Sequence, residues 1–137
     1  MRDTGAPPAP FRALVETVAP SAALDAQGWR EVARLREATL AGRPRLERAQ
    51  LALLLALLEW LPVVRFGRRF SRLDPPARAR LLEALSRSPL RLLRAGVWGA
   101  RTLALLCVYG RQAAWPDLGY RPDRRGWEAV GTREASP

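Results

Sequence analysis

Residues 50–61 read Gln-Leu-Ala-Leu-Leu-Leu-Ala-Leu-Leu-Glu-Trp-Leu, which is the most apolar run in the chain. The run contains no β-branched residue and consists mainly of strong helix formers. Because it is apolar on almost every side, it predicts a central helix over about 45–61 that other helices surround. Pro62 is expected to end this helix. A transmembrane helix needs roughly 20 apolar residues, and this run is shorter and contains Glu59, so a core helix is the preferred interpretation.

Two shorter helices are expected upstream of this run. The first has apolar residues at the i, i+3, i+4, i+7 spacing of an amphipathic helix: Phe11, Leu14, Val15 and Val18. Pro20 is expected to end it. The second begins at Asp25, a residue type that caps helix N-termini, and ends before Gly42 and Pro44. Its apolar stripe consists of Trp29, Val32 and Leu35.

Two further helices are expected downstream. Asp74 is a plausible N-cap, and Pro75 and Pro76 follow it in the first turn, where a missing N–H costs little. A long helix over about 89–109 is then ended by Gly110. This last helix contains a patch of small residues, against which another backbone can pack closely. The patch consists of Ala95, Gly96, Gly99 and Ala100.

The sequence shows no strand-like alternation, so we predict an all-α protein, an irregular bundle of about five helices with extended N- and C-terminal segments. Residues 1–10 are expected to form a flexible N-terminal segment and residues 11–110 the helical domain. Residues 111–137 form a C-terminal tail of turn residues with three aromatic side chains, Trp115, Tyr120 and Trp127. These aromatic side chains either pack on the protein's own helices or bind in grooves of a partner.

The residue types that are missing exclude several kinds of catalytic site. The chain has no His and one Cys, so it has no imidazole base, no Cys–His or Ser–His nucleophile and no intramolecular disulfide. The 13 acidic residues are scattered and show no paired-carboxylate or two-metal spacing. We therefore expect no enzyme activity, no metal and no cofactor in this chain, and a function in binding.

The net charge of +10 comes from 23 basic residues, all of them Arg. The densest basic run contains Arg65, Arg68, Arg69 and Arg72. This run is interpreted as a solvated face, as a match for an acidic patch on a partner, or as a contact for phosphates. Together with the apolar helix, the charge also fits a stand-alone basic protein that binds an anionic membrane surface or nucleic acid. The N-terminus lacks a secretory signal core and a twin-Arg pair, so a cytoplasmic location is expected unless a partner carries the chain elsewhere.

Two stretches resemble a known family. The first is Phe70-Ser-Arg-Leu-Asp-Pro-Pro-Ala-Arg-Ala-Arg-Leu-Leu-Glu-Ala-Leu85, and the second is Tyr109-Gly-Arg-Gln-Ala-Ala-Trp-Pro-Asp-Leu-Gly-Tyr120. They are similar to the gluconate 2-dehydrogenase subunit 3 family, the small subunits that accompany flavin-dependent GMC oxidoreductases. The matching residues are Phe70, Leu73, Arg78, Tyr109, Leu118, Gly119 and Tyr120. Arg121 and Pro122 stand where the family usually has Gly-Pro.

The resemblance implies a non-catalytic accessory subunit. Such a subunit binds an FAD-dependent catalytic subunit that oxidises an alcohol or a sugar hydroxyl, and it stabilises or matures that partner. FAD would be held by the partner. The matching residues, together with Trp115 and Trp127, are then candidates for the interface.

Cys107 and Glu59 are both expected to be buried. Cys107 lies on the apolar stripe of the last helix and is expected to be a small buried hydrophobic residue. Glu59 lies within the most apolar run and is expected to be a buried charge paired with an Arg.

Overall fold

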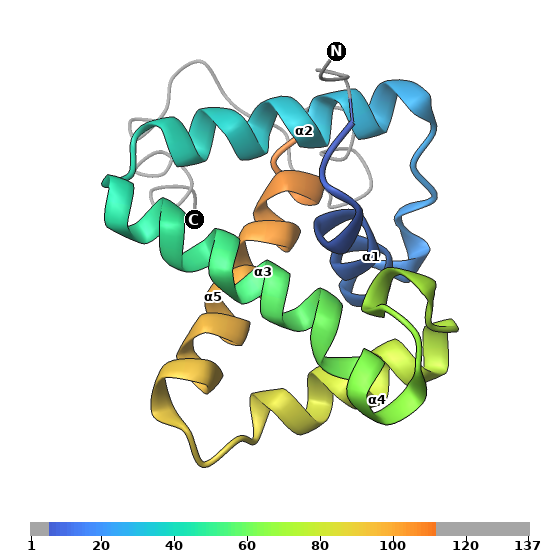
Figure 1. The fold of residues 1–137 in the computed structure, drawn as a ribbon. Helices are drawn as coiled ribbons and strands as arrows, with labels where there is room; N and C mark the ends of the chain where they lie inside the picture. The colour runs from blue at the N-terminus through green and yellow to red at the C-terminus, as the bar shows by residue number, and fades with distance from the viewer. Residues whose placement is uncertain (1–5, 112–137) are drawn as a thin grey trace, which may run out of the picture.

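The computed structural model describes residues 6–111, which fold into an all-α bundle (Figure 1). The predicted fold class of about five helices is confirmed. The α-helices are α1 (Ala9–Val18), α2 (Ala26–Ala41), α3 (Arg45–Phe66), α4 (Pro75–Ser86) and α5 (Arg91–Tyr109). Two short 3₁₀ helices, η1 (Pro20–Ala22) and η2 (Phe70–Arg72), lie in the connections. Nearly all of the predicted C-terminal tail lies outside the described residues.

Helix α1 lies at the centre of the bundle, where it packs against α3, α4, α5 and η2. Its apolar residues Phe11, Leu14 and Val15 are almost completely buried. The predicted amphipathic helix is therefore confirmed. Helix α1 occupies the central position that was predicted for the more apolar helix over residues 45–61.

Helix α3 lies at the surface, so the prediction of a central helix surrounded by others is wrong (Figure 1). Its buried residues lie along one side and comprise Leu55, Leu58, Glu59 and Pro62. Most of its other apolar side chains are exposed. The helix is apolar all round because it has two apolar faces, and the described part of the chain covers only one of them.

Pro62 does not end α3, which continues for one further turn to Phe66. Proline removes one intrahelical hydrogen bond. The bonding resumes after it, since the Gly67 N–H donates to the Val63 carbonyl oxygen at 3.0 Å. Gly67 has a φ of +67°, a left-handed conformation that glycine adopts without strain, and it ends the helix.

The other helix boundaries follow the local chemistry of the sequence. Asp25 caps α2 as predicted, because its Oδ1 accepts a hydrogen bond from the Gly28 N–H at 2.7 Å. Asp74 occupies the N-cap position of α4, although its side chain makes no capping hydrogen bond. Helix α5 ends at Tyr109 and is followed by Gly110, as predicted.

Candidate functional site

Helix α3 carries an apolar stripe that points away from the bundle. We name this set the outer stripe, and it consists of Leu46, Leu53, Leu57, Trp60 and Val64. With 3.6 residues per turn, these positions lie on one side of the helix, roughly opposite the buried Leu55 and Pro62. Leu53 is 71% exposed and Val64 is 91% exposed. In the sequence the stripe appears as apolar residues that recur every three or four positions. A helix face that packs in the core shows the same pattern, so the sequence alone does not distinguish the two.

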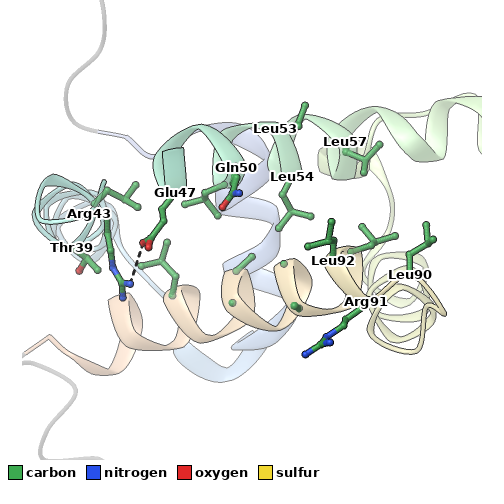
Figure 2. A pocket seen from close by; sticks show the side chains of 18 residues that line it. Thr39, Arg43, Glu47, Gln50, Leu53, Leu54, Leu57, Leu90, Arg91 and Leu92 are labelled. Carbon is green, nitrogen blue, oxygen red and sulfur yellow. Dashed lines mark hydrogen bonds and ion pairs between the residues drawn. The ribbon is translucent and has the colours of Figure 1, made fainter. Parts of the chain in front are cut away.

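An open groove of about 980 Å³ lies between α3 and α5 (Figure 2). Figure 2 shows Leu54 directed from α3 toward α5, with Leu90 and Leu92 at the start of α5. Leu57 also lines the groove and belongs to the outer stripe as well. The lining is therefore mainly aliphatic, and we name it the α3–α5 groove.

One end of the groove is polar. There, Nη1 of Arg43, which follows α2, lies 3.3 Å from Oε2 of Glu47 on α3. Both side chains are about half exposed, so this ion pair contributes little to folding stability. This pair lies at one end of the groove, and Arg91 lies beside Leu90 and Leu92 at the other end.

The predicted patch of small residues on α5 lines this groove and serves two purposes. A Cβ added to Gly96 would lie 3.3 Å from Cδ2 of Leu54, so Gly96 allows α3 to pack closely. A Cβ added to Gly99 would have no heavy atom within 4 Å. One part of the patch therefore supports helix packing, as predicted, and another part leaves the α5 backbone open to an approaching molecule.

The structure separates the predicted interface residues. Phe70 is 0% exposed and Leu73 is also buried, so both belong to the core and do not face a partner. Tyr109, at the end of α5, is partly exposed. The remaining tail candidates, Trp115, Leu118, Gly119, Tyr120 and Trp127, lie outside the described residues.

Arg78 holds the turn η2 in place. Its Nε and Nη2 donate hydrogen bonds to the carbonyl oxygens of Phe70 and Ser71 at 3.2 and 2.7 Å. Its Nη1 lies 3.0 Å from Oε2 of Glu16 on α1. Arg78 therefore joins η2 and α4 to the central helix, and the structure gives it a positioning role within the fold.

Glu59 is buried as predicted, but its partner is not an arginine. Its carboxylate accepts hydrogen bonds from the Ser71 N–H at 3.0 Å and from the Ser71 hydroxyl at 2.5 Å. Hydrogen bonds to a charged acceptor are stronger than neutral ones. Because Glu59 and Arg78 both bind the Phe70–Ser71 segment, the connection between α3 and α4 has a defined shape.

Cys107 is completely buried, as predicted. Burial raises the pKa of its thiol to about 11, an effect that the positive charge of Arg36 partly offsets. The thiol is therefore protonated and unreactive at neutral pH. Among residues 6–111, no cluster of three or more His, Cys, Asp or Glu side chains is arranged to hold a metal ion.

Comparison of the chain with protein-family models, curated proteins and solved structures finds no match. Within the described residues, α3 and α5 are long and apolar enough to cross a membrane by length and composition alone. Core helices of soluble proteins often satisfy the same criterion. In α3, however, only 22% of the most apolar window is buried. The exposed apolar surface of α3 and α5 is thus the main candidate for a functional site.

Proposed function

We propose that this protein is a non-catalytic accessory subunit that binds an apolar segment of a partner protein in the α3–α5 groove. The observation that carries the proposal is the exposure of leucines on both sides of the groove, with Leu92 89% exposed. Leu57 and Leu90 are exposed there as well. Contiguous apolar surface of this kind marks interaction sites on soluble proteins.

The shape of the groove favours a helical segment as its occupant. The part of α5 that lines it runs from Leu90 to Leu103, a length of about 20 Å at the rise of an α-helix. An amphipathic helix of about four turns spans this length and presents apolar side chains at i, i+3, i+4 and i+7. The open backbone at Gly99 allows such a helix to approach α5 closely, and the charged pair Arg43–Glu47 offers a polar contact at one end.

The family resemblance supports one choice of partner, the FAD-dependent catalytic subunit of a GMC-type alcohol or sugar oxidoreductase. In this proposal the catalytic subunit holds FAD, and this chain supports its stability or maturation. The motif residues Phe70, Leu73 and Arg78 act indirectly, since they fix the bundle that forms the groove.

Co-expression with a GMC-type flavoprotein tests the proposal. We expect a complex that co-purifies on a tag attached to this chain and carries flavin absorbance. The proposal fails if the tagged chain purifies without flavin and the flavoprotein folds equally well in its absence.

A groove-filling variant locates the binding site. Gly99→Leu places a side chain in open space within the groove, so it should leave the bundle folded and lower partner capture at least tenfold. Thr102→Leu is the matched control, because Thr102 is exposed on the same helix and does not line the groove. Equal capture by the two variants would place the partner elsewhere on the molecule.

A further inference from the structure

A second surface lies where α3 ends and the chain turns into η2. We name it the basic–apolar patch. Its members are Arg65, Arg68, Arg69, Arg72, Trp60, Val64 and Phe66. Trp60 and Val64 also belong to the outer stripe, but none of the patch members lines the α3–α5 groove. This end of α3 packs against η2.

The arginines of the patch are not neutralised by the described part of the chain. None of the ion pairs formed within residues 6–111 includes Arg65, Arg68, Arg69 or Arg72. Glu59 on α3 already accepts two hydrogen bonds from Ser71, and Asp74, the carboxylate closest to Arg72 in sequence, forms no ion pair within the described residues. The patch therefore presents positive charge that an external anion can neutralise.

The arginines also surround a hollow. Arg68, Arg69 and Arg72 line it together with Gly67, whose left-handed conformation turns the chain at the end of α3. Guanidinium groups bind phosphate oxygens through paired hydrogen bonds, and they are more weakly hydrated than ammonium groups. An anion with phosphate oxygens fits a hollow of this chemistry.

Exposed apolar side chains lie directly beside these charges. Val64 is the most exposed large hydrophobic residue of α3. The guanidinium carbon of Arg69 lies 4.3 Å from the centroid of the Trp60 ring, and that of Arg65 lies 5.9 Å from the Phe66 ring. Aromatic and aliphatic side chains interleaved with arginines are typical of protein surfaces that lie at a membrane interface.

We propose that the basic–apolar patch binds the surface of an anionic phospholipid bilayer. The arginines contact headgroup phosphates, while Trp60 and Val64, which lie one turn apart on the outer face of α3, enter the interfacial layer of the membrane. Phosphates of nucleic acid would also neutralise the arginines, but a nucleic-acid backbone offers little to Val64. The hydrogen bonds of Glu59 and Arg78 to the Phe70–Ser71 segment hold the turn that presents these side chains.

Sedimentation of the full chain with vesicles tests this inference without reference to any protein partner. We expect binding to vesicles of phosphatidylcholine with phosphatidylglycerol, weaker binding at higher salt, and little binding to phosphatidylcholine alone. The double substitution Arg68→Gln/Arg69→Gln should weaken binding about tenfold or more. Val64→Ser should weaken it several-fold with no change in charge.

The control is Arg30→Gln/Arg34→Gln, which removes the same charge from exposed positions on α2. Equal loss of binding in both double variants would overturn the inference, because net charge alone would then explain it. Absence of binding to the anionic vesicles would overturn it as well. The same is true if duplex DNA binds more tightly than the vesicles and Val64→Ser affects neither ligand.

Discussion

The two faces of α3 have similar composition and different surroundings. The inner face places Leu55, Leu58 and Pro62 in the bundle and buries Glu59 against Ser71. The outer face places Leu53 and other large apolar side chains in solvent. Both faces are rich in leucine at helical spacing. The difference shows that an apolar face identifies a surface to be covered and does not identify what covers it.

The largest expected effect on folding stability contrasts two phenylalanines that lie four positions apart in the sequence. Phe70 is completely buried, so Phe70→Ala should lower the free energy of unfolding by about 3–5 kcal/mol. Phe66 is exposed at the end of α3, so Phe66→Ala should change it by no more than about 0.5 kcal/mol. Urea denaturation measures both values. Similar losses in the two variants would show that the outer surface also belongs to the core.

The next effect concerns the hydrogen bonds that hold the turn beside the inner face. Arg78→Ala leaves the carbonyl oxygens of Phe70 and Ser71 without their side-chain donor, and it should cost about 2–3 kcal/mol. Arg80, two positions later, is exposed, and its one hydrogen bond is to a carbonyl of its own helix. Arg80→Ala is therefore the control, and equal denaturation midpoints for the two variants would contradict the positioning role of Arg78.

A smaller effect is the pH dependence of folding stability that arises from the buried Cys107 thiol. Below pH 9 the Cys107 thiol is protonated in both the folded and the unfolded chain, so it adds no pH dependence. Above pH 9 the unfolded chain releases this proton, while the folded chain retains it up to a pKa of about 11. Folding stability should therefore fall as pH rises from about 9 to 11, by at most about 1.4 kcal/mol per pH unit from this group.

Thermal unfolding of the wild type and of Cys107→Ala across this pH range isolates the contribution of the thiol. The wild type should lose stability more steeply than the variant. Parallel curves would show that the thiol is not buried from solvent as the structure places it.

The smallest effect compares two glycines of α5. Gly99→Leu adds a side chain where a Cβ meets no heavy atom within 4 Å, and it removes a glycine from a helix interior. The substitution should raise the free energy of unfolding by up to about 1 kcal/mol. Gly96→Leu should lower it, because its Cβ already lies 3.3 Å from Leu54. A loss of stability in both variants would mean that the groove is closed in solution.

Local chemistry made much of the fold predictable from sequence. The cap at Asp25, the two prolines after Asp74 and the glycine at 110 predicted helix boundaries, and apolar spacing predicted α1 and α2. The burial of Cys107 followed from its position on an apolar stripe. These features depend on residues a few positions apart.

The features that could not be predicted depend on residues far apart in sequence. The hydrogen-bond partner of Glu59 is Ser71 and not an arginine. Which residue reaches the Glu59 carboxylate depends on how the chain turns after α3. The central position of α1 depends on which face of α3 packs inward. The α3–α5 groove forms because of how those two helices are placed relative to each other. The sequence shows the leucines that line it but does not show that they lie around one groove.

One measurement tests most directly whether the exposed leucines of α3 and α5 are separate from the protein's own core. The triple variant Leu53→Gln/Leu57→Gln/Leu92→Gln replaces three exposed leucines with polar side chains of similar size. We predict that its free energy of unfolding in urea lies within about 1.5 kcal/mol of the wild-type value. A chain that is unfolded in buffer, or destabilised by about 5 kcal/mol or more, would show that these leucines form a core and would contradict the account.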